Sequence, residues 1–383
     1  MAITDKKTGV WGLDQTYNKI NQGSIWDYSG APGLFSWGSG TYGQIGQNSL
    51  TQYSSPVQIP GTSWRHITSS SYVTAALATK TDGTLWGWGH NLFGALAQND
   101  RIYYSSPVQV GGDTTWSDTL AINYRHSSAI KTDSTLWIWG FNSKGQLGQN
   151  NKTDYSSPVQ IPGTWSDVSS DLYGNLAIKT NGELWVWGYN TNGQLGINDR
   201  TEYSSPKQVP GTTWRSIHGG VYHTHATRTD GTLWSWGWNG GGRLGLNSPG
   251  PSQRSSPTQV GSDTTWSTKI VFSGSGGTRA VKTDGTMWGW GNNTNGQLGV
   301  NDTAPRSSPI QVGSGTDWSD VASGQYATAG LKTDGTLWVW GYNGQGTLGQ
   351  NQSLNRISSP VQIPGTWTSI GSRQFGFQGF SSI

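Results

Sequence analysis

The stretch KTDGTLWGWGHNLFGALAQ, residues 80–98, decides the fold, because closely similar words return along the chain. The copies occupy residues 131–149, 179–196, 228–246, 282–299 and 332–350. Each copy carries two tryptophans one residue apart, and a glycine follows the second. Self-similarity at a fixed period indicates a repeat architecture. Whether Trp-x-Trp-Gly is a binding surface or a structural element depends on that architecture.

Three sequence markers keep one period through seven units. The second tryptophan of the pair is Trp37, Trp88, Trp139, Trp187, Trp236, Trp290 and Trp340. The motif Ser-Ser-Pro ends at Pro56, Pro107, Pro158, Pro206, Pro257, Pro309 and Pro360. A lone tryptophan follows at Trp64, Trp116, Trp165, Trp214, Trp266, Trp318 and Trp367. The first marker repeats every 48 to 54 residues, which is the length of one propeller blade.

Each unit is predicted to consist of short strands and turns. After Trp64 we expect strands over 67–71, 74–78 and 85–89 and a turn at 94–96. Asp82-Gly83 predicts a two-residue hairpin loop in which both residues have positive φ. Ser105-Ser106-Pro107 is expected to close the outer edge, and 108–110 to begin the next crossing. Because no stretch has the 3.6-residue apolar period of a helix, the sequence predicts an all-β, seven-bladed β-propeller.

The two ends of the repeat each carry half of a unit. The segment after Trp367, TSIGSRQFGFQGFSSI, matches the inner half of a unit without its hairpin. The segment APGLFSWGSG, residues 31–40, supplies the outer half. We therefore predict a propeller domain over 31–383 that is closed by one blade shared between the N- and C-termini. Residues 1–30 lie outside the repeat and are expected to form an N-terminal arm.

The paired tryptophans fit the blade interfaces. Residues i and i+2 of a strand face the same side, so Trp86 and Trp88 share one face, with Gly87 on the other. The two indoles are expected to fill the wedge between blades, while the small residue lets the next blade approach. Burial of one indole contributes roughly 4–6 kcal/mol at about 25 cal/mol per Å². The sequence therefore favours a structural role over direct ligand binding.

The run GVYHTHATRTDGTLWSWG, residues 220–237, resembles a repeat of the regulator of chromosome condensation family, and so does GQLG at 145–148. The likeness covers about 350 of the 383 residues. It implies a seven-bladed propeller with a shared terminal blade. The family's founding member exchanges nucleotide on a small nuclear GTPase through a projecting wedge and carries a basic tail. The even spacing leaves no room for a wedge and no basic tail is present, so no exchange residue is carried over.

Residues 7–30, KTGVWGLDQTYNKINQGSIWDYSG, are similar to short segments of structural proteins of tailed phages. This likeness implies a component of the virion, in a tail, fibre or capsid surface, that is assembled in the host cytoplasm. Without it, a cytoplasmic location is expected. The arm would then hold the propeller to other structural proteins, and its large aromatic residues are the candidate anchors: Trp11, Tyr17, Trp26 and Tyr28.

Composition excludes several classes of protein. Charged residues make up 12%, the net charge is +3, and no run of Lys or Arg occurs, so neither nucleic acid nor anionic lipid is an expected partner. No apolar run is long enough to span a membrane, and the N-terminus lacks a signal peptide's apolar stretch. The absence of cysteine excludes disulfides and thiolate chemistry.

Two sets of equivalent positions are candidate binding rims. The residue after Trp-Gly varies from blade to blade, and its larger side chains form the first rim: His90, Phe141, Tyr189, Trp238 and Tyr342. The residue before Ser-Ser-Pro forms the second: Tyr53, Tyr104, Tyr155, Tyr203, Arg254 and Arg306. Aromatic rings around a rim can stack on sugars or on protein side chains. The alternative for the first rim is local packing over the Gly-x-Leu-Gly turn, and for the second it is drift among equivalent loops.

Catalysis and cofactor binding find little support. No serine occupies a Gly-x-Ser-x-Gly elbow, and the recurring Asp82 and Asp230 are assigned to turns, where Asp accepts local backbone hydrogen bonds. His223 and His225 share a strand face, as a metal site can require, but no third ligand is evident, so no metal or cofactor is expected. We expect a non-enzymatic interaction propeller of a virion. The alternatives are a glycan-binding propeller, and an exchange factor or propeller lyase if acids and histidines converge in the central channel.

Overall fold

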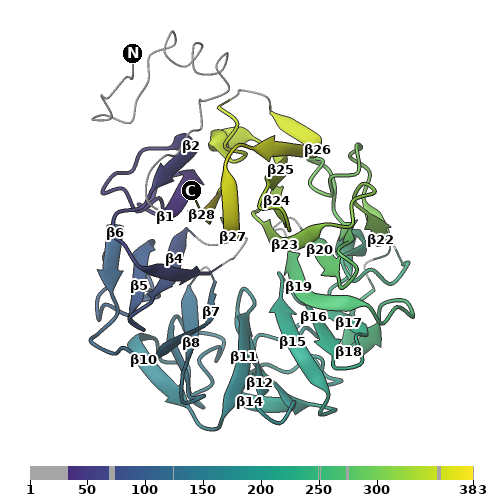
Figure 1. Cartoon of the computed structure of the whole chain (residues 1–383). Coiled ribbons are helices and arrows are strands. Elements are labelled where there is room, and N and C mark those ends of the chain that lie inside the picture. Colours follow the sequence, from purple (N-terminus) through teal and green to yellow (C-terminus); the bar gives the residue numbers. More distant parts are fainter. Residues whose placement is uncertain are drawn as a thin grey trace, which may run out of the picture.

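The computed structural model describes residues 33–68, 74–123, 125–248, 250, 252–272, 276–351 and 355–382. Its strands form seven four-stranded antiparallel sheets, which are arranged as blades around a central channel (Figure 1). Blade 1 has the strand order β2-β1-β28-β27, and blades 2 to 7 follow in chain order from β3–β6 to β23–β26. The predicted seven-bladed all-β propeller is confirmed.

The innermost strand of each blade contains the lone tryptophan, and the second strand pairs with it in a hairpin. The innermost strands are β3 (Trp64–Ile67), β7 (Trp116–Ile122), β11 (Trp165–Ser170), β15 (Trp214–Gly219), β19 (Trp266–Phe272), β23 (Trp318–Ser323) and β27 (Thr366–Arg373). The second strands are β4 (Ala75–Lys80), β8 (His126–Lys131), β12 (Gly174–Lys179), β16 (His223–Arg228), β20 (Gly277–Lys282), β24 (Ala327–Lys332) and β28 (Gly376–Ser382).

The two outer strands carry the tryptophan pair and the Ser-Ser-Pro motif. The third strands are β5 (Leu85–Gly89), β9 (Leu136–Gly140), β13 (Leu184–Gly188), β17 (Leu233–Gly237), β21 (Met287–Gly291), β25 (Leu337–Tyr342) and β1 (Gly33–Gly38). The outermost are β6 (Tyr104–Gln109), β10 (Tyr155–Ile161), β14 (Tyr203–Val209), β18 (Arg254–Gln259), β22 (Arg306–Gln311), β26 (Arg356–Ile363) and β2 (Tyr53–Gln58).

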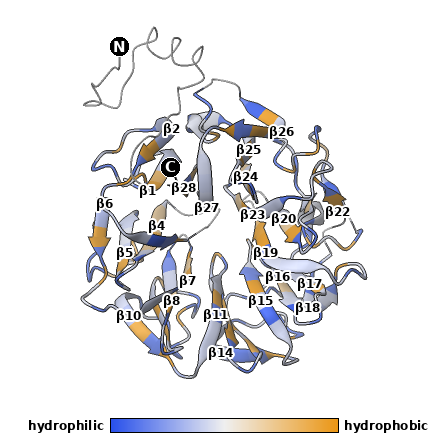
Figure 2. Cartoon of the chain, viewed as in Figure 1, coloured by the Kyte–Doolittle hydropathy of each residue, from blue (hydrophilic) through white to orange (hydrophobic). Residues whose placement is uncertain are grey.

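Helix is confined, in the described ranges, to two single turns, η1 (Gly240–Gly242) and η2 (Gly344–Gly346). Neither turn is long and apolar enough to cross a membrane. Figure 2 shows the apolar residues gathered on the strands of the blades, with hydrophilic residues along the loops. The core is therefore divided among the blade interfaces, as seven separate clusters of buried side chains.

The hairpin between the second and third strands differs from the prediction in its turn type. Gly83 has a φ of +79°, but Asp82 is not among the residues with positive φ. Gly83 N donates to Lys80 O at 3.0 Å, and Lys80 N donates to Thr84 O at 3.0 Å. These bonds describe a turn with one left-handed residue, a type I turn with a bulge, rather than a two-residue loop. Asp82 has the predicted turn role, since its carboxylate accepts from Thr84 N and Oγ1.

The Ser-Ser-Pro motif lies inside the outermost strand, at the outer edge as predicted. The crossing to the next blade, predicted to begin at residue 108, begins only after Gln109, where β6 ends. Pro107 is tolerated within β6 because an edge strand leaves one side of its backbone unpaired. The first strand was also misplaced, because β3 begins at Trp64 and not at Ile67. Of the predicted 67–71, residues 69–71 lie outside the described ranges.

A ring of backbone hydrogen bonds links each blade to the next through the Ser-Ser-Pro strand. An asparagine N–H of one blade donates to a serine carbonyl of the following blade. Six bonds run in chain order, from Asn48 to Ser105, Asn99 to Ser156, Asn150 to Ser204, Asn198 to Ser255, Asn247 to Ser307 and Asn301 to Ser358. The seventh runs from Asn351 N to Ser54 O at 3.1 Å and closes the ring.

The tryptophans of each pair have different environments, although both face the preceding blade. The second is fully buried, as Trp139 shows with an exposed fraction of 0%, and its Nε1–H donates to Ala95 O of blade 2 at 2.8 Å. The first is only half-buried. Trp137 donates to Thr135 Oγ1 and lies under the ammonium of Lys131, 4.3 Å from its ring centre. The prediction that both indoles fill the wedge is therefore fully correct for the second, while the first packs against the same cluster with part of its ring exposed.

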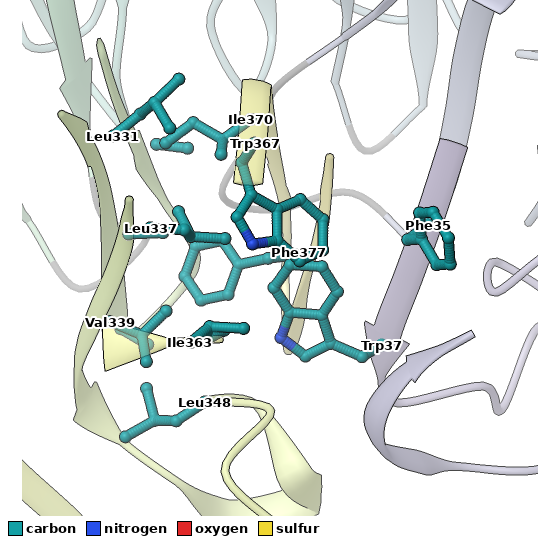
Figure 3. Close-up of a cluster of buried hydrophobic side chains, with 13 residues drawn as sticks. Phe35, Trp37, Leu331, Leu337, Val339, Leu348, Ile363, Trp367, Ile370 and Phe377 are labelled. Atoms are coloured by element: carbon teal, nitrogen blue, oxygen red, sulfur yellow. The ribbon is translucent and has the colours of Figure 1, made fainter. Parts of the chain in front are cut away.

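The shared blade closes the ring as predicted. β1 pairs with β28 in a continuous register from Gly33↔Ser381 to Gly38↔Gly376. Figure 3 shows the aromatic rings of this blade, Trp37, Trp367 and Phe377, against Val339 and Leu348 of blade 7. The ring centres of Trp37 and Trp367 are 5.6 Å apart. Side chains from both ends of the chain thus complete one buried cluster.

Candidate functional site

One end of the ring carries the connections from first to second strand and from third to fourth strand in every blade, and we call it the loop face. The other end carries the Asp-Gly hairpins and the crossings to the next blade, and we call it the hairpin face. This division follows from antiparallel order, since successive connections alternate between the two ends of a sheet. The residues after Trp-Gly therefore all lie on the loop face.

The loop face holds two linked rings of side chains, of which the sequence revealed only one. In each blade the N–H of the residue after Trp-Gly donates to the carbonyl of the residue before the second strand. The pairs are Ser39–Phe375, His90–Thr74, Phe141–Arg125, Tyr189–Tyr173, Trp238–Tyr222, Asn292–Gly276 and Tyr342–Tyr326. The second ring consists of the residues before the second strands, which are also equivalent positions of the repeat. Sequence reasoning could have found this ring from the predicted pairing of the second strand with the third.

The two rings make a continuous chain of aromatic and guanidinium groups over blades 3 to 5. The Phe93 and Phe141 rings are 5.0 Å apart, and the Arg125 guanidinium lies 4.6 Å from the Phe93 ring centre and 5.9 Å from that of Tyr173. Tyr189 lies 5.9 Å from Tyr173 and 5.9 Å from Tyr222.

The chain ends beyond Tyr222 at Trp238, whose ring lies under Arg243 at 4.0 Å. Blade 6 interrupts it with Asn292 and Gly276. Tyr342 belongs to a second, shorter group with Tyr326 and Phe375. Phe141, Tyr189, Trp238 and Tyr342 are all half-buried, so they pack locally and also present part of each ring to solvent.

His90 differs from the other residues of the first rim because it is buried, with an exposed fraction of 6%. Tyr42 and Tyr103 cover it, with ring centres 5.2 and 4.8 Å from the imidazole. Burial, together with the charge of Arg125, lowers the pKa of His90, so the imidazole is neutral near pH 7. The surface above His90 is therefore formed by Tyr42 and Tyr103.

Exposed large apolar side chains are concentrated on two neighbouring loops. Within the described residues they are Tyr42, Leu50, Leu92, Ile102 and Tyr103, with exposed fractions of 38–63%. All five lie in the third-to-fourth-strand loops of blades 1 and 2, residues 39–52 and 90–103. We call these five residues the apolar patch. Sequence reasoning missed them because it compared equivalent positions, and the patch exists only in two blades.

The second predicted rim lies on the same loop face, farther from the ring axis. Its residues pair across the sheet with the glycine of Trp-Gly, as Tyr104 does with Gly89. Tyr104 and Tyr203 donate to Asp100 and Asp199 of their own loops at 2.6 and 2.8 Å, and Arg306 pairs with Asp302. Tyr155 accepts from Asn151. These side chains hold their own loops, while Arg254 is exposed and Tyr53 half-buried.

The central channel does bring acids and histidines together, which was the condition set for the enzymatic alternative. Asp320 is paired with Lys269 at 3.4 Å, and burial lowers the pKa of His218 to about 4. Asp167 accepts only backbone N–H groups. Across the described part of the channel, no hydrogen bond joins an imidazole to a carboxylate, so the geometry contains no acid–base pair.

The paired histidines of blade 5 are core residues. His223 and His225 are fully buried and pack against Phe272 of blade 6. Burial lowers the pKa of His223 to about 3. A search of the described residues finds no group of three His, Cys, Asp or Glu side chains able to hold a metal ion. The candidate anchors of the arm, Trp11, Tyr17, Trp26 and Tyr28, lie outside the described residues.

Comparison with known proteins identifies the repeat. The sequence model of the regulator of chromosome condensation (RCC1) repeat matches residues 33–77, 133–170, 181–227, 230–281 and 284–331. A second model of this repeat matches residues 269–297 and 318–347. Together the matches cover more than half of the chain, and residues 78–132 and 348–383 lie outside them.

Two curated relatives match part of the chain. The ultraviolet-B receptor UVR8 of Arabidopsis thaliana is 30% identical over 154 residues, which are 37% of this chain and 32% of the receptor. Protein RCC2 of Homo sapiens is 31% identical over 105 residues, 27% of this chain and 20% of that protein. The chain thus spans about a third of one relative and a fifth of the other.

Solved structures with the same fold cover nearly the whole ring. Yeast RCC1 (Prp20), solved bound to Kap60, superposes with a TM-score of 0.81 at 17% identity, over 92% of this chain and 89% of that chain. Human WBSCR16 superposes with a TM-score of 0.79 at 18% identity, over 92% and 99%. At this identity the likeness establishes the fold.

Proposed function

The chain belongs to the regulator of chromosome condensation (RCC1) repeat family, and we propose that it is a non-catalytic propeller that binds a partner protein through its loop face. The observation that carries this proposal is the apolar patch. Within the described residues, every exposed large apolar side chain lies on two adjacent loops of that one face. Apolar side chains gathered on one exposed surface mark interaction sites in soluble proteins.

The surroundings of the patch suit a protein contact. Tyr42 and Tyr103 lie edge to face at 5.7 Å, and they rest on the buried His90. A ring that is already fixed in the free protein loses little conformational entropy when a partner covers it. Tyrosine, tryptophan and arginine dominate the binding energy of protein interfaces. The chain from Phe93 to Arg243 begins next to the patch and supplies all three types along the same face.

Structures of the same fold support contact with proteins. One solved relative, yeast RCC1, is described in complex with Kap60, and another report on Prp20p describes its binding properties to Gsp1p and histones. Those partners belong to those proteins. What we carry over to this chain is only that proteins of this fold bind other proteins.

Site-specific photo-crosslinking tests the proposal. A photoreactive amino acid replaces Ile102, which is 63% exposed in the patch, and as control it replaces Thr212, an exposed residue of the hairpin face. In the source organism we expect a covalent adduct with one partner protein from position 102 and none from position 212. Adducts from position 212 alone, or from neither position, contradict the proposal.

We further propose that the partner is another structural protein of a phage virion, on which the propeller is displayed for assembly or host adhesion. The support is the likeness of residues 7–30 to tailed-phage structural proteins. Deletion of residues 1–30 should leave a folded propeller that no longer co-purifies with the particle. Full incorporation of the truncated chain contradicts the anchoring role and leaves the loop-face proposal to its own test.

A second candidate function is glycan binding by the aromatic chain together with Tyr342 of the shorter group, favoured by the half-exposed rings of Tyr189, Trp238 and Tyr342. Partly exposed aromatic rings can stack on the apolar faces of sugars. Alanine at Phe141, Tyr189, Trp238 and Tyr342 together should abolish binding to a cell-surface glycan array. Binding that survives this replacement excludes the aromatic chain as a sugar site.

A further inference from the structure

A cavity of about 530 Å³ lies in the central channel. All seven innermost strands line it, through residues that include His66, Leu120, Asp167, His218, Lys269, Asp320 and Ile370. Its volume is within the range of small-molecule sites, which is roughly 300–1,000 Å³. The walls are mixed in character, with half-exposed Leu120 and Val271 beside the charged groups.

Two carboxylates of the cavity occupy the same position in their blades. Asp167 and Asp320 each stand two residues after the lone tryptophan, in Trp165-Ser166-Asp167 and Trp318-Ser319-Asp320. Each is opposite the same position of its second strand, Ile178 and Leu331. Each also accepts a hydrogen bond from the next N–H of its own strand, at 2.9 Å. The two carboxylates therefore have the same environment within their own blades.

The preceding blades differ at one position, and this difference leaves Asp167 without a counterion. Blades 3 and 6 share an irregular first strand, with the register shift running from Trp116 to Leu120 and from Trp266 to Ile270. In blade 6 the third residue after the tryptophan is Lys269, which pairs with Asp320 at 3.4 Å. In blade 3 the same place holds Thr119.

Asp167 instead accepts from Ile217 N of blade 5 at 3.3 Å, and no ion pair to it is found in the part of the chain that the structure describes. Burial raises the pKa of Asp167 to about 7, as expected for a half-buried carboxylate with no cation paired to it. In the same wall, His218 Nε2 is buried and has no hydrogen-bond partner within the described residues. Of the cations that line the cavity, Lys269 pairs with Asp320 and Arg215 donates to Trp266 O, so neither serves Asp167.

We propose that the central cavity binds a small organic cation whose ammonium group pairs with Asp167. A carboxylate in a poorly hydrated site gains most from a ligand that brings both the opposite charge and N–H donors. Leu120 and Val271 offer apolar contact to the carbon skeleton of such a ligand. A metal ion is a poorer fit, because the described residues contain no cluster of three ligating side chains. The cavity lining includes none of the five residues of the apolar patch.

Titration with n-butylammonium at pH 8, where Asp167 is mostly ionised, tests the proposal by ligand-observed NMR. The neutral n-butanol is the matched probe. We expect saturable binding of the amine, little binding of the alcohol, and a rise in the melting temperature only with the amine. Equal binding of the two probes, or none of the amine, overturns the proposal.

Two independent variants locate the site, so the test does not depend on the folding of either variant alone. Asp167→Asn should weaken amine binding at least ten-fold. Thr119→Lys supplies the cation that Lys269 supplies in blade 6, so it should also weaken amine binding at least ten-fold while Asp167 remains. Thr119→Gln, of similar length and no charge, is the control and should leave the affinity within about two-fold. Unchanged binding in both Asp167→Asn and Thr119→Lys places the amine elsewhere and refutes the assignment.

Discussion

The buried Arg279 gives the sharpest test of how the blades pack. It lies on β20 with an exposed fraction of 0%, and its Nη2 donates to Gln297 O. Nε and Nη1 have no partner in the described structure, and no salt bridge to it is found there. Burial lowers the pKa of Arg279 to about 9. From the ordinary 12.5, this shift corresponds to a penalty on the order of 5 kcal/mol for the charged form.

A leucine is the natural replacement, because the repeat already contains it. Arg279 is opposite Gly289 in the sheet, and in blade 2 the equivalent Leu77 is opposite Gly87. Gln297 O keeps two other donors, Thr328 Oγ1 and Trp340 Nε1. Arg279→Leu should therefore raise the free energy of unfolding by about 2 kcal/mol, since apolar replacement of buried ions typically gains about 1–4 kcal/mol and the shorter side chain loses some packing.

Arg373 is the matched control because it is equally buried and its pKa is also lowered to about 9 by burial. Its guanidinium, however, donates to Gln44 O, Ser36 Oγ, Trp37 O and Phe377 O at 2.6–3.2 Å. Arg373→Leu removes the donor to these buried acceptors and should lower the free energy of unfolding by at least about 2 kcal/mol.

Urea unfolding followed by tryptophan fluorescence at pH 7 measures both variants. The folded pKa of Arg279 is below its unfolded value, so the penalty is present below pH 9 and is relieved as the pH rises above it. The advantage of Arg279→Leu should then narrow by about 1.4 kcal/mol per pH unit above 9. A loss of stability in Arg279→Leu at pH 7 refutes the reasoning that this guanidinium is an uncompensated charge.

Three further predictions concern the ring. Removal of residues 370–383 deletes β28 and part of β27, so the truncated chain should lose its single cooperative unfolding transition in calorimetry, and an unchanged thermogram would contradict the shared blade. Trp139→Phe should lower the free energy of unfolding by about 2 kcal/mol, because a buried indole and its bond to Ala95 O are lost. Trp137→Phe, at the half-buried position, should lower it by less than about 1 kcal/mol, and urea unfolding measures both. The pKa of His223 falls from 6.5 to about 3 on folding. The stability that depends on its neutral imidazole is therefore fully present above pH 6.5 and is lost as the pH falls toward 3. His223→Ala should therefore gain about 3 kcal/mol relative to the parent between pH 7 and pH 4, and parallel stability profiles would show that the imidazole is not desolvated.

Local sequence was sufficient for the architecture. The spacing of Trp37, Trp88 and their copies fixed the number of blades, because each marker belongs to one unit and contacts only its neighbours. The half units at the two ends specified the shared blade for the same reason. The turn at Asp82-Gly83 was located but mistyped, since the dipeptide favours two different turns and only the strand register chooses between them.

The site depended on the repeat only in part. Equivalence between blades located Phe141, Tyr189, Trp238 and Tyr342 on one rim, and the structure keeps them together on the loop face. The comparison of equivalent positions could not show that Tyr42 and Tyr103 cover His90, because those contacts join loops of two blades. For the same reason it could not distinguish the first tryptophan of each pair from the second.

The sequence by itself determined the seven-fold ring, its closure and the alternation of large and small residues along the third strand, because the markers repeat in every unit and the half units at the two ends complete one another. The tertiary structure decided which charges are left without partners. Asp167 and Asp320 have the same local sequence, and Arg279 and Arg373 are the same residue type at the same burial. The two aspartates differ because of the neighbouring blade, where Thr119 stands in place of a lysine. The two arginines differ within their own blades, where four buried acceptors surround Arg373 and, in the described residues, Gln297 O alone accepts from Arg279.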